Sequence, residues 1–461
     1  TMEREWSRNP LAYGIQNVGS FRGASSHQHN PFTILCERGA SEDDGRCYGF
    51  SFVYSGNFMC KVEKDQYDQT RIVMGIHPKH FSYQLKPGER FTAPEVVLAY
   101  SGEGLTHLTH LYHRVYRENL CKSPYVKKER PILINSWEAA YFDFDEAKLL
   151  KIAEAAVDMG VELFVLDDGW FGNRNDDNAA LGDWDVNTAK LPQGLSGLSE
   201  EIHKMGLKFG LWIEPEMVSE NSELYRKHPD WCLQMPRRQP SRGRYQLVLD
   251  LSREDVRNYI VASINGVLDS ARIEYVKWDM NRFITDAWSA IVEKEKQGEI
   301  YHRYILGLYD IMNRIILTHP EILFCGCSGG GGRFDPGMLY YQPQIWCSDN
   351  TDAVCRLKIQ YGTTFVYPVS AMESHVSVCP NHQTGRTVPL ETRGVTAMDG
   401  ILGYELDSTK LTKEEKQICR EQVKAYKKNY PLIVCGDYYR LTNPYTFSEY
   451  VAWEHVSPGR D

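Results

Sequence analysis

Acidic and aromatic side chains recur where short apolar segments of the sequence end. Five such clusters occupy residues 135–137, 167–170, 212–216, 277–282 and 346–352. For a single acidic residue after a strand, a helix N-cap is the commoner explanation. Carboxylates gathered at one rim raise each other's pKa, so a fold that served stability alone has no reason to collect them. The five clusters together therefore favour an active site.

Carboxylates accompanied by tryptophans fit the cleavage of glycosides better than other chemistries. No histidine pair has the spacing of a zinc site, and no serine lies in a nucleophile elbow. Mg²⁺ sites rich in Asp usually serve phosphate substrates. Such substrates need several basic residues around the phosphate, and a basic cradle of that kind is absent here apart from Lys277. Glycoside cleavage needs one carboxylate to attack or shield the anomeric carbon and another to protonate the leaving oxygen.

Three motifs resemble those of the family 36 α-galactosidases, the microbial melibiases. They are Lys277-Trp-Asp279-Met-Asn281-Arg282, Cys327-Ser-Gly-Gly330-Gly-Gly332-Arg333 and Ser348-Asp349-Asn-Thr-Asp352. The likeness runs from about residue 10 to the end of the sequence. It implies a retaining, exo-acting α-galactosidase that hydrolyses melibiose and raffinose-type oligosaccharides without a metal or an organic cofactor.

The resemblance assigns the two catalytic carboxylates. Asp279 becomes the nucleophile that forms a covalent β-galactosyl-enzyme, and Asp349 becomes the general acid/base, with Asp352 as a sugar ligand or a helix N-terminal charge. Lys277 and Asn281 flank Asp279 on the same face of a strand, so they would reach the ring hydroxyls. The alternative for Lys277 is a salt bridge that keeps Asp279 ionised.

The resemblance also implies the remaining sugar contacts. Asp167 and Asp168 resemble the pair that accepts hydrogen bonds from the galactose 4- and 6-hydroxyls, for which short ionised acceptors are suited; the alternative for either is a strand-end cap. In the family pattern Cys327 and Gly330 lie against the 2-position, which favours galactose over N-acetylgalactosamine. Trp137 and Trp212 are expected to form aromatic walls of the sugar site, and Arg244 is expected to make a further contact with the substrate.

Three other residues of the clusters are expected to support the site from outside it. Trp346 lies in the middle of an expected strand, which favours a core role. Glu214 and Glu216 are expected to act as structural residues or to support the residues that contact the sugar.

The elements that must position these residues alternate between apolar strands and amphipathic helices from about residue 130, the pattern of a parallel α/β sheet. The expected strands are 132–137, 163–168, 209–214, 275–279, 322–327, 344–348, a weaker one near 369–375 and one near 401–405. The expected helices include 145–159, 253–270, 301–318 and 413–430. Eight strands over roughly 300 residues favour a (β/α)8 TIM barrel, whose active sites lie at the carboxyl ends of the strands. No glycine-rich fingerprint supports a doubly wound sheet, although a strand-like piece at 246–251 leaves the count open.

The chain divides into four expected parts. Residues 1–100 form a β-rich N-terminal domain, the tail of a larger β-sandwich, and 101–129 contain a linking helix. Residues 130–432 form the catalytic barrel, and 433–461 begin a C-terminal β domain. Where members of the family form tetramers, a neighbour's N-terminal domain can contribute to the site. The resemblance therefore implies a homo-oligomer, a tetramer if the N-terminal domain is full.

Composition and charge limit the classes of partner and the compartment expected for this protein. A net charge of −9 and a pI of about 5.9 argue against nucleic acid or an anionic membrane surface. No stretch approaches the roughly 20 apolar residues of a membrane span, and the first residues show no secretory signal. The 12 scattered cysteines are most simply free thiols in a reducing cytoplasm, with an extracellular location as the alternative.

Three other functions remain open at this point. A galactosyltransferase such as a raffinose-type synthase would share every catalytic residue, because either water or a sugar hydroxyl can resolve a retained intermediate. An α-N-acetylgalactosaminidase would use the same scaffold. A catalytically inactive sugar-binding protein is opposed by the presence of both Asp279 and Asp349.

Overall fold

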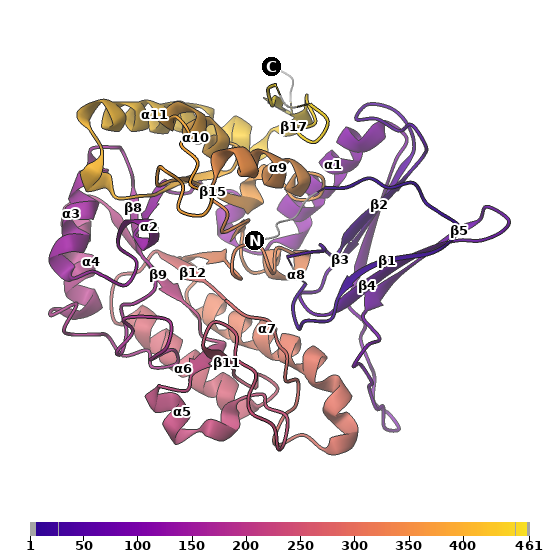
Figure 1. Cartoon of the computed structure of the whole chain (residues 1–461), viewed down its shortest axis with the longest axis horizontal. Helices are drawn as coiled ribbons and strands as arrows, with labels where there is room; N and C mark the ends of the chain where they lie inside the picture. The colour runs from indigo at the N-terminus through magenta and orange to yellow at the C-terminus, as the bar shows by residue number, and fades with distance from the viewer. Residues whose placement is uncertain (1–5, 26, 448, 459–461) are drawn as a thin grey trace.

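Eight parallel strands close into a barrel in the computed structural model, which describes residues 6–25, 27–447 and 449–458 (Figure 1). The hydrogen-bonded order is β7-β8-β9-β12-β13-β14-β15-β16, and β16 pairs with β7 to complete the circle. The strands are β7 (Leu133–Asn135), β8 (Leu163–Leu166), β9 (Lys208–Ile213), β12 (Tyr275–Trp278), β13 (Leu323–Gly326), β14 (Gln344–Trp346), β15 (Met372–Ser377) and β16 (Ile401–Glu405). The prediction of a (β/α)8 barrel is confirmed.

Helices cover the outside of the barrel and bury both faces of its strands, which is why the strands read as short continuous apolar runs. The helices between residues 137 and 435 are α2 (Trp137–Ala140), whose first residues line the cavity at the rim of the barrel, α3 (Glu146–Val157), α4 (Gly194–Lys204), α5 (Glu223–Lys227), α6 (Glu254–Asp269), α7 (Ile300–Thr318), α8 (Pro336–Leu339), α9 (Ala353–Thr363), α10 (Leu390–Met398) and α11 (Lys413–Cys435). Side-chain caps start several of them: Asp145 accepts from the Lys148 amide at 2.8 Å, and Thr412 with Glu415 forms a capping box before α11.

The strand-like piece near residue 246 lies outside the barrel. It forms β11 (Gln246–Val248), which pairs antiparallel with β10 (Met217–Ser219) in the long connection after β9. The number of barrel strands is therefore eight, and the extra strand shapes the loop that carries Arg244.

The N-terminal part consists of two three-stranded antiparallel sheets, at the indigo end of the chain in Figure 1. One contains β1 (Gly14–Ser20), β4 (Phe58–Lys64) and β5 (Thr70–Ile76); the other contains β2 (Phe32–Cys36), β3 (Cys47–Phe52) and β6 (Val96–Ser101). Helix α1 (Gly104–Val115), extended by a π-helical turn at Tyr116–Leu120, packs on the second sheet. Gly49 permits this packing, because a Cβ there would lie 2.5 Å from the Tyr112 ring.

The last strands pack back against the N-terminal part. β17 (Asp437–Arg440) pairs with β18 (Trp453–Val456). Arg440 donates to Glu42 at 2.8 Å, and His110 of α1 is hydrogen-bonded to the Tyr438 carbonyl at 2.9 Å. β17 is therefore held by the N-terminal part and by α1 beside the barrel.

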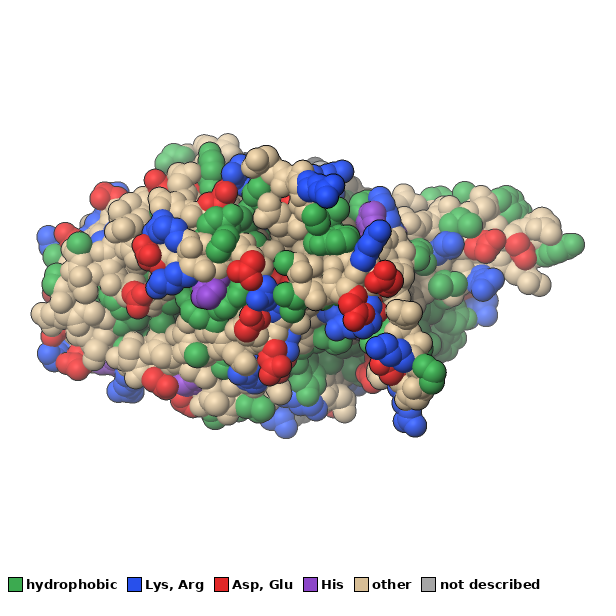
Figure 2. Space-filling view, turned by 90° about the horizontal axis from the view of Figure 1, so that it is seen from below, with side chains coloured by type: hydrophobic (Ala, Val, Ile, Leu, Met, Phe, Trp, Pro, Cys, Tyr) green, Lys and Arg blue, Asp and Glu red, His purple; other side chains and the backbone are tan. Residues whose placement is uncertain are grey.

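The surface carries mixed charge. Figure 2 shows acidic and basic side chains interspersed over the face that it displays, with no segregation by sign. Within the described ranges, no helix has the length and apolar character needed to cross a membrane.

Candidate active site

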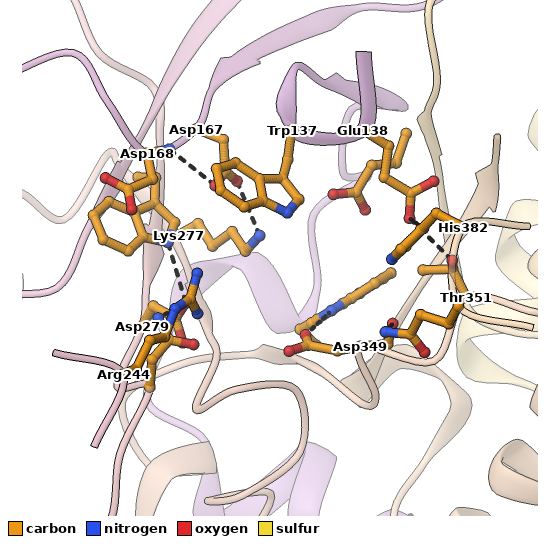
Figure 3. A pocket seen from close by; sticks show the side chains of 15 residues that line it. Trp137, Glu138, Asp167, Asp168, Arg244, Lys277, Asp279, Asp349, Thr351 and His382 are labelled. Carbon is orange, nitrogen blue, oxygen red and sulfur yellow. Dashed lines mark hydrogen bonds and ion pairs between the residues drawn. The ribbon is translucent and has the colours of Figure 1, made fainter. Parts of the chain in front are cut away.

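A cavity of about 150 Å³ lies at the carboxyl ends of the barrel strands (Figure 3). Its walls come from the ends of the strands and from the loops that follow them, because those ends converge at one rim of the barrel. The lining residues are Trp137, Glu138, Asp167, Asp168, Trp212, Arg244, Lys277, Asp279, Asn281, Trp346, Asp349, Thr351, His382, Gln383 and Glu405. Nine of the twelve residues predicted from the sequence are among them.

Asp279 directly follows β12 and is fixed through both carboxylate oxygens. Its Oδ2 accepts from Trp212 Nε1 at 3.2 Å and from Asn281 Nδ2 at 2.8 Å. Its Oδ1 accepts from the backbone amides of Met280 at 2.8 Å and Gly329 at 3.1 Å. Hydrogen bonds from donors such as these favour the ionised form of a carboxylate.

The charges around Asp279 keep it ionised. Burial alone would raise its pKa, but Lys277 and Arg244, together with the Cys327 thiol and the Gly329 amide, hold the pKa below its usual range. Arg244 is itself anchored by Asp177, with Nε 3.2 Å from Oδ1. An ionised carboxylate held in one orientation is what a nucleophile at an anomeric carbon requires.

Lys277 and Asp167 form a buried ion pair at the base of the cavity. Lys277 Nζ lies 2.9 Å from Asp167 Oδ2, and Asn135 Nδ2 donates to the same oxygen at 2.7 Å. Lys277 is 8% exposed and Asp167 4%. Burial opposes the charge of Lys277, yet Asp167 and Glu405 raise its pKa well above the usual value. The pair presents a fixed cation and a fixed anion to the cavity.

Asp168 is held by an arginine that the sequence analysis did not identify. Arg174, fully buried, donates from Nε to Asp168 Oδ1 at 3.0 Å and from NH2 to Oδ2 at 2.8 Å. Arg174 also lies 3.6 Å from Asp177. Because Asp177 pairs with Arg244 as well, it links the two arginines. An Arg six positions after a strand-end Asp was visible in the sequence, but no periodicity relates the two across the intervening loop.

Asp349 lies on the opposite side of the cavity from Asp279 (Figure 3). Its Oδ1 accepts from Trp346 Nε1 at 3.0 Å. Trp346 is buried, as expected of a core residue, but it has a second role that the sequence analysis did not anticipate. β14 ends at Trp346, so the indole stands at the end of the strand, lines the cavity and binds Asp349.

Gly330 and Cys327 contact the two catalytic candidates without lining the cavity as the structure describes it. Gly330 has a φ of 81°, and a Cβ there would lie 2.6 Å from the Asp349 amide nitrogen. Cys327 is 3% exposed. Burial and the nearby Asp279 and Asp349 raise the pKa of its thiol, which keeps it protonated and able to donate to Asp279.

Asp352 caps a helix and, among the described residues, is not part of the cavity wall. Its Oδ1 accepts from the Cys355 amide at 2.9 Å at the start of α9, and its Oδ2 accepts from Thr384 Oγ1 at 2.7 Å. Arg386 pairs with the same carboxylate at 2.5 Å. Of the two roles anticipated for Asp352, the structure places it in the helix N-terminal position.

Glu138, Thr351, His382 and Gln383 form a polar wall beside Asp349 that the sequence analysis did not anticipate. Glu138 accepts from Thr351 Oγ1 at 3.0 Å and lies 3.1 Å from His382 Nδ1. Gln383 Nε2 donates to the Asp349 carbonyl at 2.7 Å. Three of these residues lie in loops without regular periodicity, so strand and helix patterns could not place them.

Glu405 completes the cavity at the end of β16. Its carboxylate pairs with His375 at 3.0 Å, and His375 pairs in turn with Glu373 at 2.9 Å inside the barrel. Burial opposes the charge of Glu405, but the hydrogen bond from His375 and the charge of Lys277 lower its pKa. A second anion therefore faces Lys277 from the barrel interior.

The two glutamates after β9 are buried supports. Glu216 receives both terminal nitrogens of Arg333, at 3.0 and 2.7 Å, and the Trp278 indole at 3.0 Å. Glu214 accepts from Gln246 Nε2 at 3.0 Å, and burial beside Asp279 raises its pKa to about 8. Both are fully buried, and neither lines the cavity in the described part of the chain.

The N-terminal part reaches the catalytic loops. His27 Nε2 lies 2.6 Å from the carbonyl oxygen of Gly329, whose amide binds Asp279. Ser25 donates to Asp335 at 2.7 Å, and Asn30 donates to the Phe334 carbonyl at 2.8 Å. The glycine loop after β13 is thus held from the N-terminal part of the same chain.

No group of three or more His, Cys, Asp or Glu side chains within residues 6–25, 27–447 and 449–458 is arranged to hold a metal ion.

Known families account for nearly the whole chain. The melibiase family model matches residues 90–436, and the model of the glycosyl hydrolase family 36 N-terminal domain matches residues 1–86.

Two similar proteins are named as α-galactosidases. α-Galactosidase AgaA of Geobacillus stearothermophilus is 57% identical over 458 residues, which cover 99% of this chain and 63% of AgaA. Its crystal structure superimposes with a TM-score of 0.98, covering 100% of this chain and 64% of that one. The bifunctional α-galactosidase/sucrose kinase AgaSK of Mediterraneibacter gnavus is 54% identical over 460 residues, covering 100% of this chain and 48% of AgaSK. This chain therefore spans less than two thirds of the length of AgaA and less than half of that of AgaSK.

Two further structures of AgaA variants are complexes with stachyose and with raffinose. Each is 57% identical to this chain and superimposes with a TM-score of 0.98, covering 100% of this chain and 64% of the variant.

Proposed function

The chain belongs to glycoside hydrolase family 36, the melibiases, and we propose that it is a retaining exo-α-galactosidase. Its substrates are terminal α-galactosyl residues of melibiose and raffinose-type oligosaccharides. AgaA, the relative crystallised with raffinose and stachyose, supports this substrate class.

The reaction proceeds by two displacements at the anomeric carbon. Asp279 attacks that carbon while Asp349 protonates the departing glycosidic oxygen, which leaves a covalent β-galactosyl ester on Asp279. Asp349 then takes a proton from water, the water oxygen attacks the same carbon, and the ester bond breaks. The product is α-galactose, and both carboxyl groups return to their starting protonation states.

Galactose is recognised by charges whose positions are fixed by the protein's own hydrogen bonds and ion pairs. Asp167 and Asp168 accept hydrogen bonds from the 4- and 6-hydroxyls, and Lys277 donates from the base of the cavity. Trp137 and Trp212 provide aromatic walls, while Asn281 and Arg244 make further contacts. Cys327 and Gly330 lie behind the catalytic pair and limit space at the 2-position.

One observation carries the proposal. Asp279 is bound through both oxygens, has its pKa held below the usual range by Lys277 and Arg244, and faces Asp349 across a cavity whose base contains the buried Lys277–Asp167 pair. A general sugar-binding site has no need of an ionised carboxylate held between Lys277 and Arg244. A nucleophile requires that arrangement.

The test compares three nitrophenyl glycosides: the α-galactoside, the α-glucoside and the α-N-acetylgalactosaminide. We expect kcat/KM for the galactoside to exceed the other two by at least about 100-fold, because a site built to bind a hydroxyl discriminates strongly against its absence or displacement. Comparable rates on the galactoside and the glucoside would overturn the proposal. Comparable rates on the galactoside and the N-acetylgalactosaminide would overturn the assignment of the 2-position.

The compartment and the assembly state belong to the same proposal. All twelve cysteines are free thiols, which supports a reducing compartment such as the cytoplasm. We expect a homo-oligomer in the full protein, and light scattering of that protein measures its subunit number.

A further inference from the structure

The cavity has one buried wall and one exposed rim. Asp167, Asp168 and Lys277 are between 3 and 8% exposed, so the sugar that they contact is enclosed. The His382 side chain is 31% exposed, and Gln383 is also exposed. Both lie beside Asp349 and line the same cavity. Arg244, which lines the cavity on the side of Asp279, is 33% exposed as well, so contact with Asp349, and not exposure alone, singles out this rim as the place where a leaving group lies.

The orientation of His382 is fixed from behind by Glu138. The Glu138 carboxylate is 2% exposed and lies 3.1 Å from His382 Nδ1. It also accepts from Thr351 Oγ1 and from the Val378 amide, each at 3.0 Å, so three groups hold it in place. When one ring nitrogen of a histidine is committed in this way, the other is presented in a defined direction. Figure 3 shows the His382 ring reaching into the cavity between Glu138 and Asp349.

The loop that carries His382 is also tied to the general acid. Gln383 Nε2 donates to the backbone carbonyl of Asp349 at 2.7 Å. Thr384 Oγ1 donates at 2.7 Å to Oδ2 of Asp352, which lies three residues after Asp349. His382 therefore keeps a fixed position relative to Asp349. A group hydrogen-bonded to His382 Nε2 would be held next to the oxygen that Asp349 protonates.

We propose that the Glu138–His382 pair forms the subsite for a pyranose leaving group, in which His382 Nε2 binds a hydroxyl of the departing sugar while Asp349 protonates its glycosidic oxygen. This inference rests on the proposed α-galactosidase function. The polar rim of Glu138, Thr351, His382 and Gln383 suits a hydroxylated leaving group. An alkyl or aryl leaving group offers no hydroxyl for Nε2 to bind.

The test uses three α-galactosides that differ only in the leaving group. Melibiose releases a sugar, methyl α-galactoside releases a poor leaving group without further hydroxyls, and nitrophenyl α-galactoside releases a good one. For His382→Ala we expect kcat/KM on melibiose to fall by about 10- to 100-fold relative to methyl α-galactoside, the factor for a lost hydrogen bond to a charged group. His382→Gln, which places an amide nitrogen near the Nε2 position, should restore part of that ratio.

The control is Thr387→Ala, on the same loop but outside the described cavity wall, which should leave the ratio at its wild-type value. Equal losses on melibiose and methyl α-galactoside, with nitrophenyl α-galactoside spared, would overturn the subsite and make His382 a positioning residue for Asp349. An unchanged ratio in His382→Ala would also overturn it. A wild-type enzyme inactive on all three galactosides would instead refute the proposed function.

Discussion

The two sides of the cavity differ in how their side chains are held. Asp167, Lys277 and Asp279 stand at the ends of β8 and β12. Lys277 pairs with Asp167, and Asp279 accepts hydrogen bonds from Trp212 and Asn281. Asp349, His382 and Gln383 lie on the loops after β14 and β15, where exposure rises. We call the first set the nucleophile wall and the second the acid rim. The wall suits the constant part of a substrate, and the rim suits a leaving group that varies and must depart.

The largest effect is expected at the centre of the nucleophile wall. Asp279→Asn removes the anion that forms the covalent intermediate, so kcat/KM on every α-galactoside should fall by at least about 10⁴-fold. Circular dichroism should show an intact fold. Added azide should restore turnover and give the β-galactosyl azide; an α-azide would mean that Asp279 is not the nucleophile.

Asp349→Ala should instead produce a loss that depends on the leaving group. Melibiose needs protonation of its leaving oxygen, so its cleavage should slow by about 10²- to 10⁴-fold, the usual contribution of a general acid. Release of nitrophenolate needs no proton and should slow far less in the bond-cleaving step, which burst kinetics can isolate. Equal losses on both substrates would show that Asp349 does not act by protonating the leaving oxygen, and the acid rim would then not differ in function from the nucleophile wall.

A pH profile examines the electrostatics of the nucleophile wall. Asp279 acts ionised, and its lowered pKa keeps it ionised at pH values below the usual Asp range. Lys277→Met removes a cation that lowers that pKa, so the acid limb of kcat/KM should move to higher pH by about one unit or more. Lys204→Met removes an exposed pair with Glu201 and serves as the control. An acid limb that does not move in Lys277→Met would show that Lys277 does not lower the pKa of Asp279.

The smallest effect is expected at Cys327, whose thiol is near both carboxylates. Cys327→Ala removes one thiol donor to Asp279, so galactoside kcat/KM should fall by less than about tenfold. The space gained should raise the rate on the α-N-acetylgalactosaminide relative to the galactoside. A larger loss on the galactoside with no gain on the other substrate would assign Cys327 to support of Asp279 alone.

The same contrast explains what could be predicted from the sequence. Barrel strands are short continuous apolar runs, and the polar residues that end these runs located Asp167, Lys277 and Asp279. The contribution of His382 depends on a loop that follows a weakly marked strand. Trp346 was assigned to the core because β14 was expected to run to residue 348, whereas it ends at Trp346.

Residues joined only by tertiary contacts could not be paired from spacing. Arg174 meets Asp168 across an irregular loop, and Glu138 meets His382 although 244 positions separate them in the sequence. Glu405 ended a predicted strand, but its pairing with His375 depends on the register between β15 and β16. Such contacts are set by closure of the barrel and by loop conformation, which local patterns do not contain.

The central claim is that Asp279 becomes covalently attached to galactose, and trapping that intermediate tests it most directly. A 5-fluoro-α-galactosyl fluoride slows hydrolysis of the ester, so the labelled enzyme can be digested and its peptides sequenced by mass spectrometry. We predict one fluorogalactosyl group per active site, carried by Asp279. A label on Asp349, or active enzyme that turns over the fluoride by inversion without any label, would contradict the account.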